Sequence, residues 1–285
     1  MLSIDDVQTI GVCGAGTMGA GIAQVAAMAG FRTLLYDVQP ANLEKAEAQV
    51  KRQLQTAVEK GKLTQAAADK AFHLLYFTSD LMDCTAEVFI EAIVEKPEAK
   101  IALFNQLAEL NHSDVVFASN TSSLSIRSIA QRIPNPSRVA GMHFFNPAHL
   151  MQLVEVVTGP QTAPWVADTL YDLAKALGKK PVRVQDAPGF IVNRVARHFY
   201  IESMEIAGQG VADLHTIDRL LESAGFRMGP FALMDLIGHD INLAVSQSLY
   251  DAFRQSPRFK PHALQVSKVA EGKLGRKTGE GFYKY

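Results

Sequence analysis

Short apolar segments alternate with longer segments of helical periodicity as far as Asp186. The apolar segments are rich in β-branched residues, which predicts buried strands. They lie at Thr9–Cys13, Thr33–Tyr36, Val88–Ala92, Val115–Ala118, Arg138–Phe145, Leu153–Thr158 and Pro181–Val184. Helical patterns lie between them, at Gly19–Ala29, Ala41–Lys60, Pro97–Leu110 and Trp165–Leu177. This alternation predicts an α/β fold built on a doubly wound, largely parallel sheet.

After Asp186 the pattern becomes helical. Pro188-Gly189 predicts the start of a helix that runs to about Ala207, and only the last few residues of the chain resemble a strand. Further helical patterns cover Asp213–Ser223, Pro230–Phe253 and Pro261–Glu271. We therefore expect two domains, residues 1–186 with the sheet and residues 187–285 built from helices.

A glycine-rich turn follows the first predicted strand and opens the first predicted helix. It has the spacing G-x-G-x-x-G and consists of Gly14, Ala15, Gly16, Thr17, Met18 and Gly19. In such turns the first glycine permits the tight bend and the second lets the backbone approach a pyrophosphate. The third lets the helix pack closely on the strand. The free N–H groups at the helix N-terminus then face the phosphates, so the turn predicts a dinucleotide site.

Asp37 strengthens this interpretation, because it ends the second predicted strand 18 residues after Gly19. Its carboxylate would accept hydrogen bonds from the ribose hydroxyls and repel a 2′-phosphate, which favours NAD. Arg32 and Gln39 keep NADP open, and FAD, which uses the same motif, is the main competitor. The alternative without a ligand, an incidental aspartate after a glycine turn, requires all of these features to coincide.

Two ionisable side chains interrupt the later apolar strands. His143 lies within Arg138–Phe145 and Glu155 within Leu153–Thr158, and both would be costly to bury unless they pair. Alcohol oxidation needs a base near neutral pKa, which histidine supplies, and a carboxylate on its other ring nitrogen fixes the tautomer. Ser122 or a neighbouring hydroxyl at a strand end could donate to the substrate oxygen. A satisfied core histidine is the competing interpretation.

Composition and charge narrow the function classes. The chain has 285 residues, 48% hydrophobic and 20% charged, which is ordinary for a globular protein. A net charge of −1 gives no general attraction to nucleic acid or anionic membranes, and no apolar run reaches the ~18 residues of a membrane span. The acidic N-terminus does not resemble a signal peptide, and Cys13 and Cys84 form no disulfide framework. We expect a cytoplasmic protein without a metal site.

Several segments of the chain resemble the L-3-hydroxyacyl-CoA dehydrogenase family, in the same order and over essentially the whole length. They are GAGTMGAGIA, SNTSSLSI, GMHFFNP, LVEVV, PGFIVNR, MGPFALMDLIG and LGRKTGEGFY. The resemblance implies a Rossmann-type NAD-binding domain and an all-helical C-terminal domain that forms a homodimer, with the active site in the cleft between them. It also implies reversible oxidation of an L-3-hydroxyacyl-CoA to a 3-oxoacyl-CoA.

The same resemblance implies the site residues. The catalytic base falls on His143, its orienting carboxylate on Glu155, and the groups that hold the substrate on Ser122 and Asn193. Besides the glycine-rich turn, the implied cofactor contacts are Asp37, Glu95, Lys100, Ser122, Asn146 and Lys277. A lysine that contacts CoA falls on Lys60, whereas a second CoA contact, a serine in the family, meets Gln53. The helix with Lys45, Lys51, Arg52, Lys60 and Lys62 could bind CoA phosphates or be a solvated charged face.

Two departures from the common family form bear on the acyl group. Ala148–Gln152 replaces the usual segment after HFFNP, and its His149 is interpreted as a rim histidine rather than a second base. The segment Asn193–Tyr200, with Arg194 and Arg197, resembles the branch of the family that acts on dicarboxylic 3-hydroxyadipyl-CoA. Arg197 could pair with a distal carboxylate, or it could serve an inter-domain or dimer interface.

Two other functions were weighed against this one. A non-catalytic NAD-sensing protein on the same scaffold predicts loss of the His–Glu pair, which is present here. The 3-hydroxyisobutyrate and 6-phosphogluconate dehydrogenases use a catalytic lysine on the helical domain, and no such motif accompanies Asn193.

Overall fold

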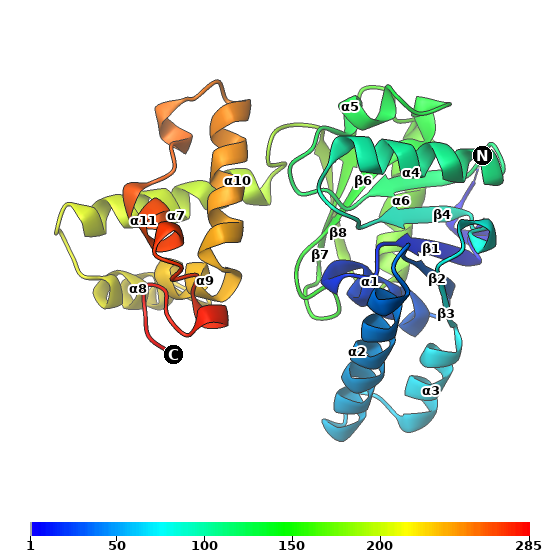
Figure 1. The fold of residues 1–285 in the computed structure, drawn as a ribbon, viewed down its shortest axis with the longest axis horizontal. Helices are drawn as coiled ribbons and strands as arrows, with labels where there is room; N and C mark the ends of the chain where they lie inside the picture. The colour runs from blue at the N-terminus through cyan, green and yellow to red at the C-terminus, as the bar shows by residue number, and fades with distance from the viewer. Residues whose placement is uncertain (1) are drawn as a thin grey trace. The chain divides into compact units, whose positions relative to one another are not determined.

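The computed structural model describes residues 2–285 and divides into two compact units, the first ending at Asp186 and the second running from Ala187 to Tyr285 (Figure 1). The first contains the sheet and the second is helical, with two isolated β-bridges near the C-terminus.

An eight-stranded sheet forms the centre of the first unit, in the order β3-β2-β1-β4-β5-β6-β7-β8 (Figure 1). The strands are β1 Thr9–Cys13, β2 Arg32–Tyr36, β3 Leu75–Thr78, β4 Val88–Glu91, β5 Val116–Ser119, β6 Val139–Phe144, β7 Leu153–Thr158 and β8 Lys180–Gln185. Every neighbouring pair is parallel except β6 and β7. The predicted doubly wound, largely parallel sheet is confirmed.

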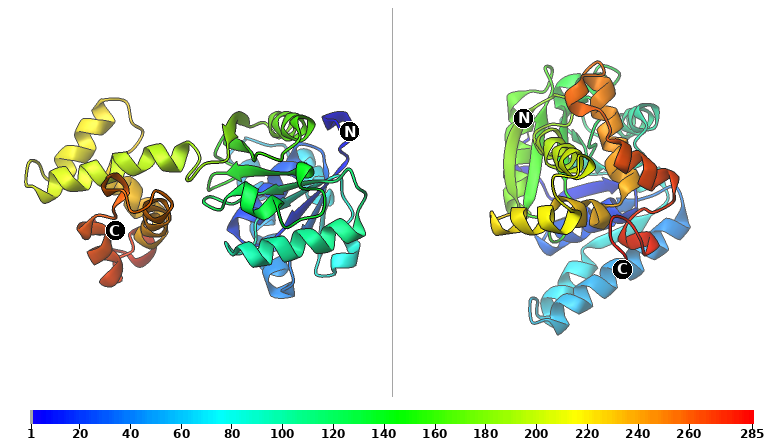
Figure 2. Two further views of the ribbon diagram at one scale, coloured as in Figure 1. Left: turned by 90° about the horizontal axis from the view of Figure 1, so that it is seen from above. Right: turned by 90° about the vertical axis from the view of Figure 1, so that its left-hand side faces the viewer.

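Helices flank this sheet and connect its parallel strands. They are α1 Thr17–Met28, α2 Pro40–Glu59, α3 Gln65–His73, α4 Pro97–Leu110, α5 Ile126–Ala130 and α6 Pro164–Ala176. α1 packs against β1 and β2, and α6 packs against β7 and β8. α2 and α3 lie side by side and extend beyond the sheet (Figure 2).

Burial explains why the central strands read as continuous apolar runs. Every residue of β4, β5 and β6 is buried, because helices cover both faces of a parallel sheet. The ionisable exceptions within these strands and β7 are Glu91, His143 and Glu155, at 0%, 6% and 0% exposure. Such side chains require specific partners, and all three belong to the networks described below.

Three elements, α3, β3 and the short α5, were not predicted from the sequence. β3 is an edge strand that pairs only with β2 and has the exposed Tyr76, so its apolar pattern is weak. α3 buries only Ala68 and Ala71, and small alanines give little periodic contrast. Packing against neighbouring elements, rather than a strong pattern in their own sequences, accounts for α3 and β3.

The second unit consists of α7 Val192–Gly208, α8 Leu214–Ser223, α9 Pro230–Ile237, α10 His239–Ala252 and α11 Ala263–Ala270, with short 3-10 turns. The prediction of a single helix over Pro230–Phe253 is wrong, because the helix is interrupted at Gly238, between α9 and α10. Gly238 has φ +100°, a conformation that favours glycine, and it lets the chain turn from α9 into α10.

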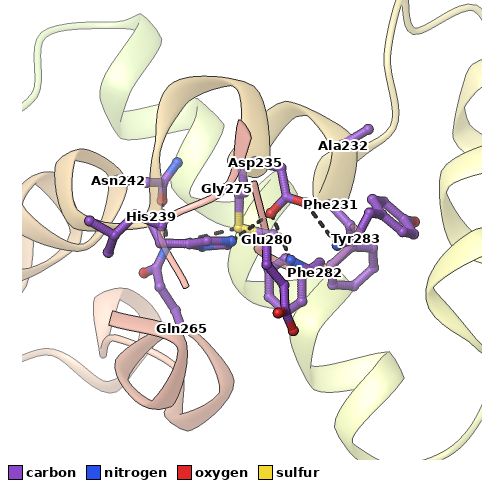
Figure 3. A network of polar contacts seen from close by, with 12 residues as sticks. Phe231, Ala232, Asp235, His239, Asn242, Gln265, Gly275, Glu280, Phe282 and Tyr283 are labelled. Atoms are coloured by element: carbon purple, nitrogen blue, oxygen red, sulfur yellow. Dashed lines mark hydrogen bonds and ion pairs between the residues drawn. The ribbon is translucent and has the colours of Figure 1, made fainter. Parts of the chain in front are cut away.

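The C-terminal segment is fastened to α9 by a buried carboxylate, Asp235 (Figure 3). Its oxygens accept hydrogen bonds from the backbone N–H groups of Phe282 and Tyr283, at 2.8 and 2.9 Å, and from the Tyr285 hydroxyl at 3.0 Å. The buried His239 lies 2.7 Å away through Nε2. The aromatic terminus GEGFYKY is therefore an ordered part of the helical unit.

Candidate active site

His143 and Glu155 face each other across the antiparallel pair β6 and β7. They are direct partners in the strand register, so the fold places both side chains on the same side of the sheet. His143 Nδ1 and Glu155 Oε2 are 2.7 Å apart. Glu155 is completely buried and His143 is 6% exposed, so the pair lies in a medium of low polarity. The predicted pairing of these two residues is present.

The geometry assigns the ring nitrogens different roles. An ionised carboxylate only accepts hydrogen bonds, so the N–H group at Nδ1 of His143 donates the hydrogen bond to Glu155. In the neutral ring Nε2 then holds the lone pair and can accept a proton. Once Nε2 is protonated, the charge on Glu155 stabilises the imidazolium. The pair has the arrangement of a general base with an orienting carboxylate.

Two further residues hold the strand end around His143. The side-chain oxygen of Asn120 accepts a hydrogen bond from the backbone N–H of Phe144, at 2.8 Å. The ring of Phe145 packs against the imidazole, with 4.5 Å between the ring centroids. Asn120 follows β5, so it ties the ends of two neighbouring strands together.

Ser122 lies in a segment that Glu95 holds in place. The backbone N–H of Ser122 donates to Glu95 Oε1 at 3.0 Å, and the Thr121 hydroxyl donates to the same oxygen at 2.5 Å. The Ser123 hydroxyl adds a contact of 3.3 Å. Thr121 is fully buried, whereas Ser122 is partly exposed. The segment therefore presents Ser122 at the surface from a fixed base.

The glycine-rich turn has the geometry that a dinucleotide requires. Gly14 has φ +101°, and a Cβ there would lie 2.6 Å from the carbonyl oxygen of Ala92. A Cβ on Gly19 would lie 1.7 Å from the carbonyl oxygen of Gly14, so a side chain would force α1 off the strand. A Cβ on Gly16 would meet no atom within 4 Å, so the chain does not need this glycine for packing. Open space at Gly16 fits the approach of a pyrophosphate.

Asp37 shapes this turn directly. Its Oδ2 accepts the backbone N–H of Ala15 at 2.8 Å, and its Oδ1 accepts that of Gln39 at 2.9 Å. Thr17 and Met18 begin α1, where the first N–H groups of a helix lack acceptors within it. The residues present therefore fit a nicotinamide dinucleotide, with phosphates at the turn and a ribose at Asp37.

Glu95 and Lys100, expected to contact the cofactor, bind each other. Lys100 Nζ lies 3.0 Å from Glu95 Oε2 and 2.6 Å from Oε1 of Glu91. Lys100 is 1% exposed, while the Glu95 side chain is 39% exposed. Glu91 was not singled out from the sequence, although a glutamate within the apolar run Val88–Ala92 is the same kind of exception as Glu155.

The other expected residues of the first unit are exposed. Asn146 follows the end of β6, and Lys60 caps the C-terminal end of α2. Between α2 and α3 lies a cavity of about 600 Å³, lined in part by Lys51, Arg52 and His73. Lys51 already pairs with Glu47 at 2.8 Å and lies over the ring of Phe72. These contacts suit a solvated charged face as well as a phosphate site.

In the helical unit, Asn193 is the second residue of α7 and is partly buried. Lys277 Nζ lies 2.5 and 2.6 Å from the two carboxylate oxygens of Asp240. Burial would raise the pKa of Asp240, but the hydrogen bonds from Lys277 and from backbone N–H groups lower it. Lys277 is thus bound to Asp240 next to the turn at Gly238.

Arg197 is 3% exposed and lies inside the helical unit. Its Nη1 donates to the backbone and side-chain oxygens of Asn242, both at 2.9 Å, and to the hydroxyl of Ser246 at 3.0 Å. Burial lowers the pKa of the guanidinium to about 10. These contacts join α7 to α10, so they favour a packing role. They disfavour the alternative predicted from the sequence, in which Arg197 pairs with a distal carboxylate.

Two features are absent from residues 2–285. No helix there is long and apolar enough to cross a membrane. No group of three or more His, Cys, Asp or Glu side chains in that range is arranged to hold a metal ion.

Comparison with known proteins agrees with this geometry. A model described as 3-hydroxyacyl-CoA dehydrogenase, NAD binding domain, matches residues 9–187, and one for the C-terminal domain of the same family matches residues 189–285. The 3-hydroxyadipyl-CoA dehydrogenase of Escherichia coli K12 is 47% identical over 280 residues, which are 98% of this chain and 59% of that protein. This chain thus spans less than two thirds of that relative.

Two other relatives match over nearly their whole length. A probable 3-hydroxybutyryl-CoA dehydrogenase of Deinococcus radiodurans is 40% identical over 96% of this chain and 99% of its own. The structure of (S)-3-hydroxybutyryl-CoA dehydrogenase from Ralstonia eutropha has a TM-score of 0.93 at 38% identity and covers 98% of this chain and 99% of its own. The expected family, enzyme class and cofactor, NAD rather than FAD, are confirmed. The chain belongs to the 3-hydroxyacyl-CoA dehydrogenase family, with its NAD binding domain in the first unit.

Proposed function

We propose that the protein catalyses the reversible oxidation of an L-3-hydroxyacyl-CoA to the 3-oxoacyl-CoA. The observation that supports this most directly is the buried pair of His143 and Glu155, joined at 2.7 Å across β6 and β7. A non-catalytic NAD-sensing protein would have no use for a buried base held in one tautomer by a carboxylate. The family names of the relatives point the same way.

His143 moves the proton in this proposal. In the oxidative direction Nε2 takes the proton of the substrate hydroxyl, and Glu155 stabilises the imidazolium through Nδ1. Ser122 and Asn193 hold the reacting oxygen, which fixes the distance over which the proton is transferred. NAD, when bound, supplies the hydride acceptor. The glycine-rich turn and Asp37 would hold it, and Asn146, Glu95 and Lys277 are the further contacts that we propose.

The acyl group is proposed from the relatives. Those compared above are named for 3-hydroxyadipyl-CoA and 3-hydroxybutyryl-CoA, so one of these two is the expected substrate. Lys60, exposed at the end of α2, is a proposed contact for CoA. Initial rates of reduction of acetoacetyl-CoA, longer 3-oxoacyl-CoAs and 3-oxoadipyl-CoA, each with NADH and NADPH, decide between the substrates.

Replacement of His143 by Gln tests the base. We expect kcat to fall at least about 100-fold, since general base catalysis is worth roughly 10² to 10⁴, while the Kd for NADH changes little. The exposed His112→Gln serves as the control and should keep wild-type activity. Retention of most activity in the His143 variant would refute the assignment.

We also propose a homodimer formed through the helical unit, and a cytoplasmic location without nucleic-acid or membrane partners. Large exposed apolar side chains are concentrated in the helical unit, among them Val195, Leu220 and Ile241 at 65, 68 and 53% exposure. Exposed apolar side chains mark a protein interface when they lie together on one surface, which is what we propose for these three. The free, buried thiols of Cys13 and Cys84 suit a reducing compartment.

A further inference from the structure

A continuous series of polar contacts runs from the interior of the sheet to Ser122. It begins at Glu91, the last residue of β4, whose Oε1 binds Lys100 Nζ at 2.6 Å. Lys100, on α4, binds Glu95 Oε2 at 3.0 Å. Oε1 of the same Glu95 accepts the backbone N–H of Ser122 at 3.0 Å. Each link is a hydrogen bond or an ion pair that includes at least one charged group, which makes it stronger than a contact between neutral groups.

A second series of hydrogen bonds also connects Glu91 with the segment that contains Ser122. Glu91 Oε2 accepts the hydroxyl proton of Ser119 at 2.7 Å, and Ser119 Oγ accepts the backbone N–H of Thr121 at 3.3 Å. The Thr121 hydroxyl donates to Glu95 and accepts the N–H of Leu124 at 2.8 Å. The segment before and after Ser122 is therefore fixed on both sides.

The charges explain why these contacts hold together. Lys100 and Glu91 are 1% and 0% exposed, so neither ion has water to replace a lost partner. Burial raises the pKa of Glu91, and Lys100 opposes that rise. Burial also acts to raise the pKa of Glu95, but Lys100 and Thr121 lower it overall. One buried ammonium thus keeps the partly exposed Glu95 ionised and in place.

We infer that Lys100 and Glu91 are positioning residues, which act through Glu95 to fix the segment that presents Ser122 to the substrate. This inference rests on the proposed function, in which Ser122 holds the reacting oxygen. It differs from the expectation that Lys100 contacts the cofactor, because the ammonium is buried between two carboxylates of the protein itself. A displacement of about 1 Å at such a segment is enough to reduce turnover about 100-fold.

A double-mutant cycle between Lys100→Met and Ser122→Ala tests the inference in the full-length enzyme. With acetoacetyl-CoA and NADH, we expect Lys100→Met to lower kcat by 10-fold or more and to change the Kd for NADH less than 3-fold. In the Ser122→Ala background the same change should lower kcat less than 3-fold, because its effect passes through Ser122. An equal loss in both backgrounds, or a loss explained by weaker NADH binding, would overturn the inference.

Amide hydrogen exchange gives a readout that does not depend on activity. Lys100→Met should accelerate exchange in the peptide 119–125 by 10-fold or more, whereas the matched control Lys96→Met, at an exposed position before α4, should not. Unchanged exchange overturns the inference even if the proposed function is correct. Conversely, a wild-type protein inactive on all 3-oxoacyl-CoAs contradicts the proposed function, while the exchange result still decides on the network.

If Lys100→Met does not fold, Thr121→Val replaces it in both experiments. This substitution preserves the shape of the side chain and removes the hydroxyl, which donates to Glu95 and accepts the N–H groups of Ser123 and Leu124. We expect faster exchange in the peptide 119–125 and a loss of kcat that disappears in the Ser122→Ala background. A fully protected peptide would contradict the role of Glu95 as the link.

Discussion

At the scale of single residues, the contacts of Arg197 show how an exception in a sequence can have a structural cause. The guanidinium is buried and binds the uncharged oxygens of Asn242 and Ser246, and its Nε lies 3.3 Å from the carbonyl oxygen of Asn193. An arginine one turn after Asn193 was expected to select dicarboxylic substrates or to serve an interface. Its contacts instead join two helices of the same unit.

We therefore predict that Arg197→Met lowers stability without changing substrate preference. Loss of the guanidinium removes its buried hydrogen bonds to Asn242 and Ser246, each from a charged donor and worth about 1.5–3 kcal/mol, while Gln265 and Ser246 still donate to Asn242. Urea unfolding measures this cost. KM for 3-hydroxyadipyl-CoA and for 3-hydroxybutyryl-CoA should change by the same factor. A rise confined to 3-hydroxyadipyl-CoA would show that Arg197 pairs with the distal carboxylate after all.

The sequence could reveal His143 and Glu155 because ionisable residues in apolar strands stand out. Glu91 is an exception of the same kind, because it lies within the apolar strand Val88–Ala92. Lys100 could not be found in this way, since a lysine on a helix is normally solvated and only the tertiary structure buries it. Asn120 is similar: its contact with Phe144 depends on which strand lies next to β5.

At the scale of elements, α9 depends on partners from distant parts of the chain. Asp218 on α8 accepts the backbone N–H groups of Phe231 and Ala232, at 2.9 and 3.0 Å, and so caps the first turn of α9. Asp235 on α9 holds the C-terminal segment (Figure 3). The two carboxylates thereby link α8, α9 and the terminus into one packing unit.

We predict that Asp235→Asn destabilises the protein by at least about 2 kcal/mol near pH 7, because hydrogen bonds to a charged group are lost. Burial acts to raise the pKa of Asp235, but the hydrogen bonds from His239, Phe282 and Tyr283 lower it overall. A carboxyl with a lowered pKa stabilises the fold above its ordinary value of about 3.9, and this contribution disappears as the pH falls through the folded pKa.

The difference in the free energy of unfolding between wild type and Asp235→Asn should therefore be constant from pH 7 to about pH 4 and shrink as the pH is lowered further. Asp172→Asn removes a surface carboxylate, half exposed and paired with Lys175, and serves as the control with little effect at any pH. A difference between wild type and the Asp235 variant that is independent of pH would contradict the role of the charge.

Long, strongly patterned elements such as α2, α4 and β7 were predictable almost to the residue, because burial of one face determines their periodicity. The division of Pro230–Phe253 into two helices was not, since both parts have helical patterns. A continuous helical pattern does not reveal that Gly238 adopts φ +100°. A Cβ at this position would also lie 3.0 and 3.1 Å from the side chains of Asp240 and Lys277.

At the scale of the whole molecule, the unequal distribution of exposed apolar side chains supports the proposed dimer. We predict that sedimentation of the full chain at micromolar concentration gives twice the monomer mass of 31.1 kDa. Val195, Leu220 and Ile241 lie on three different helices of the second unit, α7, α8 and α10. At least one of the three Glu substitutions at these positions should dissociate the dimer.

Met82→Glu, at a 70% exposed position of the first unit, is the matched control and should leave the dimer intact. A monomeric wild-type protein would refute the proposed assembly. A dimer that survives all three substitutions in the helical unit would place its interface elsewhere.

The cross-strand register of His143 and Glu155 also bears on how such enzymes can diversify. The pair is held by the ladder from Gly141 opposite Val157 to Phe144 opposite Val154, so its geometry does not depend on the length of the connection at 145–152. Slippage by one residue would turn one of the two side chains to the other face, which the buried strands resist. We therefore expect the proton-transfer pair to keep its register when the exposed positions of this connection, Leu150 and Met151, are varied.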